Sequence, residues 1–525
     1  MCTCDQIKHI LSLCTSCVGA TSTAGFTDIK RENQLWQQDL LPYADKEEVT
    51  EKFVTDVAKK LVQFLAISND RNSKIINFVT PEEIKACFDF TLPEYGTSLG
   101  GILEQVENIL HYVVKTAHPR FYNQLWAGVD VNCLMGQWIA NTTNTSMYTY
   151  EMAPLYVMME KTILNKFQEY VGYKNGDGLL FPGGSISNIQ AMNLARYKYC
   201  PDLKKTGLFA AKKLISYVSE EGHYSISKAA ALIGIGMDNV VKVKTGTRGK
   251  IIVKDLEDKI KETIARNEQP FFVCATGGTT VGGAYDPLDE IADVCEKYKI
   301  WMHIDAAWGG SCLISKKHKH LMKGCHRADS ITWNPHKLMN CLLQCSVLLT
   351  KENGLLKQCN STGATYLFQQ DKKLYDVAWD TGDKTFQCGR SNDVLRLWLM
   401  WKAKGTAGME EHVDLAFSNA RYLADQVKAR SNFELLREPE CANVCFRYIP
   451  PGISTLADGP EKLEKLAKVP PEIKKRMTHE GTLMIGYQPL KDHGNFFRMI
   501  TSNSAANPAD MDFILNEIER LGKDL

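Results

Sequence analysis

Three segments of the sequence that carry polar side chains directly follow short runs that are typical of buried β-strands. These runs are apolar and rich in β-branched or aromatic residues, as in strands covered on both faces. The segments are Asp305-Ala306-Ala307-Trp308-Gly309-Gly310 after Trp301–Ile304, Asn334-Pro335-His336-Lys337 after Ser330–Trp333, and Pro182-Gly183-Gly184-Ser185-Ile186-Ser187-Asn188 after Leu179–Phe181. Because ligands of open α/β sheets bind outside the carboxyl ends of the strands, the three segments predict one site.

The side chains at these strand ends match the needs of one cofactor, pyridoxal phosphate (PLP). PLP requires an amine for its aldehyde, an anion for its pyridinium nitrogen and a helix N-terminus for its phosphate. Lys337, Asp305 and the Gly184-Ser185 helix start supply one group each. Taken alone, Lys337 fits a solvated surface charge better, and the glycine-rich start could also serve a nucleotide. No G-x-x-x-x-G-K-[ST] segment is present, however, and no G-x-G-x-x-G follows the first strand.

Hydrophobic periodicity predicts the elements that position these segments. Apolar residues at helical spacing over 53–65 and 102–113 predict two amphipathic helices, and a third helix is predicted between Pro287 and Lys299. Further strands are predicted at 214–218, 271–274 and 345–349. The alternation of strands and helices indicates an α/β protein with a mainly parallel sheet.

The pattern changes after about residue 395. A long helical stretch over 395–428 precedes a strand at 443–448, and Pro470-Pro471 is expected to break the chain before a helix at 472–479. We therefore predict four parts along the chain. They are a flexible leader (1–45), an N-terminal helical segment (46–124), a large cofactor-binding domain (125–394) and a small α+β C-terminal domain (395–525).

Composition excludes several classes of protein. The 525 residues carry 62 Lys and Arg against 61 Asp and Glu, with 44% hydrophobic and 23% charged residues, as in ordinary globular proteins. The basic excess of a nucleic-acid binder is absent, and no apolar run reaches the length of a membrane span. A protein that acts on small molecules, without stable membrane insertion, is expected.

The 17 cysteines are odd in number and scattered through predicted core elements, which indicates reduced thiols and a cytoplasmic location. Cys2, Cys4, Cys14 and Cys17 flank a short, weakly apolar stretch that does not match a signal peptide. Three interpretations of this group stay open: a disordered reduced tail, a metal site or reversible acylation. Elsewhere no metal site is predicted.

Five motifs closely resemble the glutamate/cysteine-sulfinate branch of the PLP-dependent group II amino acid decarboxylases. They are Asn334–Lys337, His303–Trp308, Pro182–Asn188, Tyr366–Asp371 and Asn495–Arg498. The resemblance runs from about residue 50 to the C-terminus. It implies an aspartate-aminotransferase-like (type I) fold and a homodimer whose active site lies at the interface.

The resemblance also implies a role for each site residue. Lys337 would form the Schiff base with PLP and later transfer protons, Asp305 would pair with the pyridinium nitrogen, and His223 and Ala307 would contact opposite faces of the ring. Gly184 and Ser185 would hold the phosphate, Thr280 rather than Thr279 and Asn334 would complete the cofactor shell, and Arg498 would bind the substrate α-carboxylate. Without the family context, His223 fits a core histidine and Arg498 a surface ion-pair partner.

Tyr375 matches the loop tyrosine that, in the family, protonates the carbanion after carbon dioxide leaves. The segment Asp371-Lys372-Lys373-Leu374-Tyr375-Asp376 is one residue longer than the Asp-Lys-x-Tyr-Asp of glutamate decarboxylases. One extra residue moves an extended chain by roughly 3.5 Å. Tyr375 is thus expected to be catalytic, with an ordinary loop tyrosine as the alternative.

Substrate preference is predicted from two segments. Glutamate decarboxylases have small hydroxyl residues at the positions of Trp126 and Ala127, whereas cysteine-sulfinate enzymes have an aromatic residue at 126. Ser146 and Tyr148 stand where glutamate enzymes have Asn and Phe. The Tyr148 hydroxyl and the Gln124 amide are candidate donors to a short acidic side chain.

We therefore expect α-decarboxylation of cysteine sulfinate to hypotaurine, of aspartate to β-alanine, or of both. The runner-up is glutamate decarboxylase, which makes GABA, because one methylene changes discrimination by only about 1–3 kcal/mol. An aldehyde-forming PLP decarboxylase and a non-catalytic homologue are further alternatives. Tyr375 argues against the former, and the presence of both Lys337 and Asp305 argues against the latter.

Overall fold

The computed structural model describes residues 40–43, 45–369, 371, 374–489 and 493–525. Most of the predicted leader, including Cys2, Cys4, Cys14 and Cys17, lies outside the described residues. The described chain divides into two units. One contains residues 40–67 and 76–114, and the other contains 68–75 and 115–525.

The first unit contains all but the last two residues of α2 (Glu47–Asn69), together with α3 (Pro81–Cys87) and α4 (Leu99–Tyr112). Helices α2 and α4 confirm the two helices predicted from periodicity. At the start of α3 the Thr80 hydroxyl and the Glu83 side chain form a reciprocal capping box. Val54 and Val62 of α2 and Ile109 of α4 remain exposed. Within this unit, therefore, part of the apolar surface of both long helices is left in solvent.

The second unit is built on a seven-stranded sheet with the order β2-β8-β7-β6-β5-β3-β4. The strands are β2 (Asp177–Phe181), β3 (Leu214–Ser219), β4 (Val240–Val243), β5 (Gln269–Thr276), β6 (Trp301–Asp305), β7 (Ser330–Trp333) and β8 (Ser346–Thr350). Strands β7, β6, β5, β3 and β4 pair in parallel, and β8 pairs antiparallel with both β7 and β2. The mainly parallel α/β sheet predicted from the sequence is confirmed.

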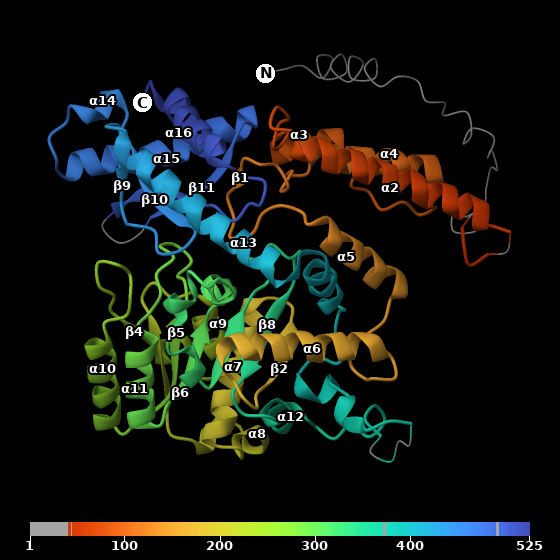
Figure 1. Ribbon diagram of the computed structural model, residues 1–525, viewed down its shortest axis with the longest axis vertical. Helices are drawn as coiled ribbons and strands as arrows, with labels where there is room; N and C mark the ends of the chain where they lie inside the picture. Colours follow the sequence, from red (N-terminus) through yellow and green to blue (C-terminus); the bar gives the residue numbers. More distant parts are fainter. Residues whose placement is uncertain (1–39, 44, 370, 372–373, 490–492) are drawn as a thin grey trace. The chain divides into compact units, whose positions relative to one another are not determined.

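Both faces of this sheet are buried, because alternate residues of its strands enter different hydrophobic clusters. Tyr217 and Val273 belong to one cluster, and Val218 and Phe272 belong to the other. The first face is covered by α6 (Pro154–Val171), α10 (Val253–Ala265) and α11 (Leu288–Tyr298), the second by α7 (Gly184–Tyr199), α9 (Ser225–Leu232) and α12 (Leu355–Asn360). Figure 1 shows α10 and α11 beside β4, β5 and β6. The helices leave the strand ends free to carry the site.

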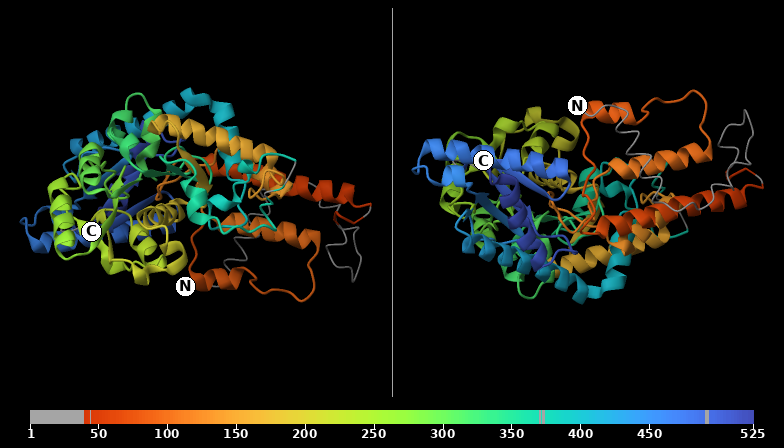
Figure 2. Two further views of the ribbon diagram at one scale, coloured as in Figure 1. Left: turned by 90° about the horizontal axis from the view of Figure 1, so that it is seen from below. Right: turned by 90° about the horizontal axis from the view of Figure 1, so that it is seen from above.

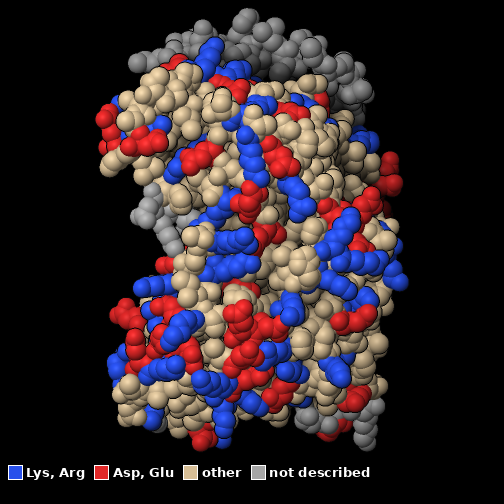
Figure 3. All heavy atoms as spheres, turned by 60° about the vertical axis from the view of Figure 1, so that its left-hand side comes forward, with Lys and Arg blue, Asp and Glu red and all other residues tan. Residues whose placement is uncertain are grey.

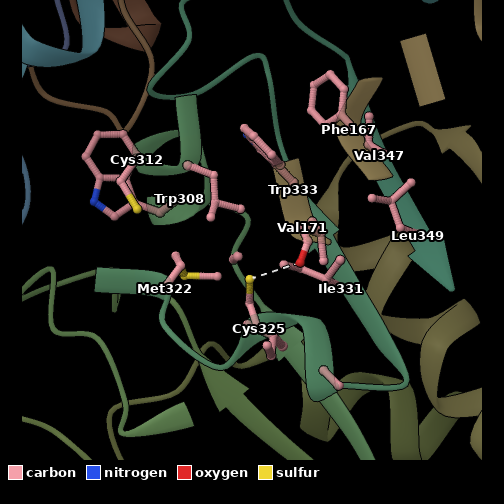
Figure 4. Packing of buried hydrophobic residues seen from close by; sticks show 14 of the residues in the cluster. Phe167, Val171, Trp308, Cys312, Met322, Cys325, Ile331, Trp333, Val347 and Leu349 are labelled. Carbon is pink, nitrogen blue, oxygen red and sulfur yellow. Dashed lines mark hydrogen bonds between the residues drawn. The ribbon is translucent and has the colours of Figure 1, made fainter. Parts of the chain in front are cut away.

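Figure 4 shows the packing on the first face, where Phe167 and Val171 of α6 lie over Trp333 and the strands β7 and β8. The ring centroids of Phe167 and Trp333 are 4.4 Å apart, and the Cys325 thiol donates to the Val171 carbonyl at 3.5 Å. Burying each such side chain stabilises the fold by about 2 kcal/mol. Trp333 ends β7 directly before Asn334, so this packing also anchors the segment that leads to Lys337.

A second, five-stranded sheet has the order β1-β11-β12-β10-β9. Its strands are β1 (Phe121–Tyr122), β9 (Phe433–Leu435), β10 (Asn443–Tyr448), β11 (Met484–Pro489) and β12 (Asn495–Ile500). The helices α15 (Pro460–Glu480) and α16 (Pro508–Gly522) pack next to each other on it, as the two blue helices in the right-hand view of Figure 2 show. The long helix α13 (Val394–Ala429) contributes Val413 to the core of the large sheet and Leu423 to that of the small one.

The expected chain break at Pro470-Pro471 is wrong, because both prolines lie inside α15. A proline at 471 cannot donate to the carbonyl of Ala467, four residues earlier. The Asn495 amide donates to that carbonyl instead, at 3.0 Å. Leu466, Pro470 and Ile473 share the buried side of the helix. Tertiary contacts therefore replace the local hydrogen bond that the proline removes.

Charged side chains of both signs are interleaved on the face shown in Figure 3. Many of them pair locally, as where Lys297 of α11 and Glu257 of α10 approach to 2.7 Å. Among the described residues, no helix is long and apolar enough to cross a membrane.

A buried ion pair between α6 and the segment before α13 yields a stability prediction. Arg390 and Glu160 are joined by two hydrogen bonds of 2.7 and 2.9 Å, and their side chains are only 3% and 2% exposed. Glu160→Ala leaves an uncompensated buried guanidinium, so we expect a loss of about 3–5 kcal/mol in unfolding free energy, measured by urea denaturation of the apoprotein. The control is Glu169→Ala on the same helix, because Glu169 is 67% exposed in its pair with Lys166. Equal midpoints for the two variants would contradict the prediction.

Candidate active site

A cavity of about 330 Å³ lies where β5, β6 and β7 end. Most of the predicted site residues line it, although they come from distant parts of the chain. They are Gln124, Trp126, Gly184, Ser185, His223, Thr280, Asp305, Ala307, Asn334, Lys337 and Arg498. The tertiary structure thus brings the three strand-end segments together at one edge of the sheet.

Lys337 lies in the turn that follows β7, where its amide donates to the Asn334 carbonyl at 3.0 Å. Desolvation lowers the pKa of its ammonium group from the usual value, an effect that nearby Arg498 reinforces and the Asp305 carboxylate opposes. A lower pKa increases the fraction of neutral amine, which is the form that attacks an aldehyde. The location and the electrostatics both suit a nucleophilic lysine.

Asp305 is the last residue of β6 and is 7% exposed. Its Oδ1 accepts from the Ala307 amide at 3.1 Å, and its Oδ2 accepts from the Asn188 side chain at 2.8 Å. These two bonds hold the carboxylate in one orientation. A carboxylate can accept about four hydrogen bonds, so capacity remains for a cationic partner in the cavity.

The start of α7 presents backbone N–H groups to the cavity. Gly183 precedes the helix with φ of +100°, a conformation that side-chain-bearing residues rarely adopt, and no side chain caps the helix. A Cβ atom at Gly184 would lie 2.8 Å from the Asn334 side-chain amide and 3.3 Å from the Ala307 Cβ, so a larger residue there would displace Asn334. An uncapped helix N-terminus of this kind is suited to a phosphate.

His223 lines the cavity just before α9, and its ring centroid lies 4.2 Å from that of Tyr224. Its Nδ1 lies 2.9 Å from the Ser225 hydroxyl and accepts from the Ser225 amide at 3.3 Å. Desolvation lowers the pKa of its imidazole, against the opposing effect of Asp305. Burial therefore favours a neutral ring at physiological pH.

Arg498, in β12 of the small sheet, extends its guanidinium into the same cavity. Nη1 donates to the Thr280 carbonyl at 3.2 Å and Nη2 to the Asn123 carbonyl at 3.1 Å. The Nε atom is buried and has no partner among the described residues. Neutral carbonyls leave the positive charge uncompensated, so the group is prepared for an anionic ligand.

The neighbouring threonines differ in position. Thr280 lines the cavity, whereas the Thr279 hydroxyl accepts from the Ala284 amide at 3.1 Å within the loop.

Four predicted site residues do not line this cavity in the same chain. Ala127 is buried, at 3% exposure, and is not part of the lining. Ser146 accepts from the Arg390 amide at 3.0 Å, and Tyr148 is half-buried in the same segment. The Tyr375 hydroxyl donates to Asp380 at 2.9 Å and accepts from the Glu151 amide at 3.3 Å.

Several lining residues were not predicted, among them Asn188, Thr276, Trp308 and His336. Asn188 had a detectable signal, because it lies four residues after Gly184 and so on the same side of a helix that begins there. His336 belongs to the Asn334–Lys337 motif, and burial lowers its pKa to about 4. Trp308 likewise ends the His303–Trp308 motif, whereas Thr276 carries no comparable signal.

The observed groups fit PLP. An amine with a lowered pKa, a carboxylate with spare acceptor capacity and an uncapped helix start all line one cavity, and the partnerless Arg498 Nε provides for a second anion. Lys337 would hold the aldehyde carbon, Asp305 the pyridinium nitrogen, and Gly184 and Ser185 the phosphate. Among the described residues, no group of three or more His, Cys, Asp or Glu side chains is placed to hold a metal ion.

This fold and this set of groups define a PLP-dependent enzyme of the type I fold. The model of the pyridoxal-dependent decarboxylase conserved domain matches residues 81–449. The chain therefore belongs to the pyridoxal-dependent decarboxylase family and is a carboxy-lyase that uses PLP.

Relatives and solved structures agree with this assignment. The chain is 50% identical to the acidic amino acid decarboxylase GADL1 of Xenopus tropicalis over 90% of this chain and 93% of that protein. It is 48% identical to the human GADL1, over 90% and 91% of the two chains. The crystal structure of mouse CSAD matches with a TM-score of 0.89 and 48% identity over 91% of this chain and 100% of that one. The structure of Oryza sativa TDC with PLP and tryptamine, at 21% identity and a TM-score of 0.82, shares the fold.

The position of Lys337 leads to a labelling prediction. When the protein is loaded with PLP and reduced with borohydride, we expect one pyridoxyl group on Lys337, because its lowered pKa and its place in the cavity favour reaction there. Peptide mass spectrometry identifies the modified lysine. Lys337→Arg should abolish the adduct, and Lys351→Arg, which changes an exposed lysine at the other end of the sheet, should not. An adduct that persists in Lys337→Arg would contradict the assignment.

Proposed function

We propose that the protein decarboxylates a short acidic amino acid, cysteine sulfinate or aspartate, to hypotaurine or β-alanine. The observation that carries this proposal is the Trp126 indole, which lines the cavity together with Arg498 and Gln124. The Trp126 ring packs against Phe121 with centroids 5.9 Å apart, so the indole is braced by β1. A bulky indole at this position shortens the space for the substrate side chain. The names of the GADL1 and CSAD relatives support the same substrate class.

Arg498 provides the first step, which is to fix the substrate. Its guanidinium is the cavity's carboxylate binder, because its carbonyl partners leave its charge uncompensated. Holding the α-carboxylate decides which bond at Cα stands in the reactive orientation, and so favours loss of carbon dioxide. The Gln124 amide lies on the same cavity wall and is a donor for the second acidic group.

Asp305 and Lys337 serve the chemical step. When bound, PLP supplies an electron sink for the electron pair that remains at Cα as carbon dioxide leaves. The Asp305 carboxylate, held by Ala307 and Asn188, stabilises positive charge at the cofactor nitrogen. Lys337 Nζ would hold the cofactor and would carry a proton for product release.

Replacing the indole should change substrate preference. In a competition among equal concentrations of cysteine sulfinate, aspartate and glutamate, we expect hypotaurine or β-alanine to dominate in the unchanged protein. Trp126→Ser opens the cavity and should shift relative kcat/KM toward glutamate by about 10- to 100-fold. The control is Trp398→Ser, which removes a half-buried indole of α13 that does not line this cavity. Dominant GABA formation by the unchanged protein would identify a glutamate decarboxylase and refute the substrate proposal.

We also propose a homodimer in which each active site is completed by the partner subunit. Exposed apolar residues gather on α5 (Val131–Thr143), with Val131 and Ile139, and on α6, with Leu155 and Met158. Such a surface is typical of one covered by a second copy. In addition, Ser146, Tyr148 and Tyr375 do not line the cavity of their own chain, although the family resemblance gives them active-site roles.

A cytoplasmic location is proposed from the 13 described cysteines, all of which are free thiols.

Subunit complementation tests the shared site. Tyr375→Phe should bind PLP normally but form little amine, and Lys337→Arg should form none. In a mixed dimer, one of the two sites would have both residues intact. Because random pairing makes half of the dimers mixed, we expect roughly one quarter of the unchanged protein's amine formation from an equal mixture. Activity no greater than that of the separate variants would show that Tyr375 does not act across the interface.

A further inference from the structure

A chain of side-chain hydrogen bonds runs behind the cofactor cavity. Its members come from β6, β7, α7, α9 and the segment before α9, and of them only Asp305 and His223 were predicted site residues. Trp301 Nε1 donates to Ser330 Oγ at 2.9 Å, Ser330 Oγ lies 2.8 Å from His303 Nδ1, and His303 Nε2 lies 3.1 Å from Asn188 Oδ1. Asn188 Nδ2 then donates to Asp305 Oδ2 at 2.8 Å and to Ser225 Oγ at 2.9 Å, and Ser225 Oγ lies 2.9 Å from His223 Nδ1. Asn188 is therefore the branch point between Asp305 and His223.

The Asp305 carboxylate determines which atoms donate and which accept in the part of the chain from Asp305 through Asn188 to His303. A carboxylate oxygen only accepts, so the atom of Asn188 that faces it is the amide nitrogen, and Oδ1 faces His303. His303 Nε2 must then carry a hydrogen, because an amide oxygen cannot donate. Thr332 Oγ1 lies 3.5 Å from the same nitrogen, a longer contact.

The remaining contacts of His303 determine the donors and acceptors as far as Trp301. Burial lowers the pKa of His303 to about 4, so its ring is neutral and Nδ1 is an acceptor. Ser330 consequently donates its hydroxyl hydrogen to His303 Nδ1 and accepts from the Trp301 indole. All three side chains are buried, so water cannot substitute for a missing partner.

Two contacts from Ser225 determine the tautomer of His223. The Ser225 hydroxyl accepts from Asn188, and its own hydrogen is then available for His223 Nδ1. Independently, the Ser225 backbone amide, which can only donate, points to the same Nδ1 at 3.3 Å. Nδ1 thus accepts from both groups, and the hydrogen of the neutral ring lies on Nε2. No protein partner for Nε2 is found in the described part of the chain, and the ring lines the cavity.

We propose that Asn188 is a positioning residue that orients the Asp305 carboxylate and, through Ser225, holds His223 as the Nε2–H tautomer, a hydrogen-bond donor toward the bound substrate. The Asn188 amide thereby orients the Asp305 carboxylate, which would face the cofactor nitrogen. It also orients the His223 N–H, which would face the carboxylate that is lost. This inference rests on the proposed function, because Asp305 acts there on the cofactor and the His223 donor faces the substrate that it decarboxylates. An asparagine that only filled space would leave the tautomer of His223 unchanged on replacement.

The test uses the full chain with 15N-labelled histidine, with and without PLP. Long-range 1H–15N correlation spectra distinguish the two neutral tautomers, and His223→Gln assigns the His223 signals. We expect the Nε2–H pattern for His223 in the unchanged protein and a mixed or shifted pattern in Asn188→Ala. Asn193→Ala is the matched control, because Asn193 lies on the same helix and donates to Cys359 Sγ at 3.4 Å.

PLP affinity, measured by fluorescence titration, provides a second signal. Losing a hydrogen bond to a charged group predicts an affinity about tenfold weaker in Asn188→Ala, with no change in Asn193→Ala. If Asn188→Ala does not fold, Ser225→Ala tests the same branch, since it removes the hydroxyl and keeps the backbone amide. The proposal is overturned by an Nδ1–H pattern in the unchanged protein, or by an unchanged His223 pattern and PLP affinity in the variants. The spectra of the apoprotein need no turnover, so they remain informative if the proposed substrates prove wrong.

Discussion

The burial of the Asp305 carboxylate is the constraint on which the rest of the site depends. A carboxylate at 7% exposure is costly unless hydrogen bonds and a cationic partner compensate it. The Ala307 amide, directly after β6, supplies one bond, and Asn188 of α7 supplies the other. The helix α7 must therefore pack so that Asn188 reaches β6. The same packing places the uncapped start of α7 beside Asn334 and Ala307, so the anion site for a phosphate and the acceptor for a pyridinium nitrogen are positioned together.

The small sheet contributes the residues that we propose recognise the substrate. β12 carries Arg498, and β1 brings the segment that contains Gln124 and Trp126 next to it through the parallel pairing of β1 with β11. Arg498 is held by carbonyls of Asn123 and of Thr280, which belongs to the loop after β5. The position of the Arg498 guanidinium thus depends on the relative position of the two sheets of the second unit. The helix α13, with residues in both hydrophobic cores, holds the sheets together.

The polar side chains buried on the two faces of the large sheet form hydrogen bonds that fix the orientation of their neighbours. The chain from Trp301 to His223 satisfies groups that would each be costly if left unpaired, and it does so in only one arrangement of hydrogen atoms. Arg390 and Glu160 act similarly at the other side of the sheet, where they fix Met147 and Thr381 near the segment of Ser146 and Tyr148. In both places, buried hydrogen bonds determine how neighbouring polar groups are oriented.

Several features followed from the sequence alone. Short apolar runs alternating with helices correctly indicated a mainly parallel sheet and the residues at its carboxyl edge, because local composition reports strand burial and helical crossovers join parallel strands. Asp305, Lys337 and the Gly184-Ser185 helix start could be joined into one site on that basis. Helical periodicity likewise identified α2, α4 and α11.

Other features were decided by tertiary structure. Pro470 and Pro471 lie within a helix because Asn495, from another strand, satisfies the carbonyl of Ala467. Asn188 acquires its place from contacts with Asp305, His303 and Ser225, which are 37 to 117 residues distant. Tyr375 and Ser146 matched the family's site residues in sequence, yet they do not line the cavity of their own chain. Local sequence specifies which element forms and which groups end it. Hydrogen-bond partners that are distant along the chain determine where those groups point, because packing, not sequence spacing, brings them within reach.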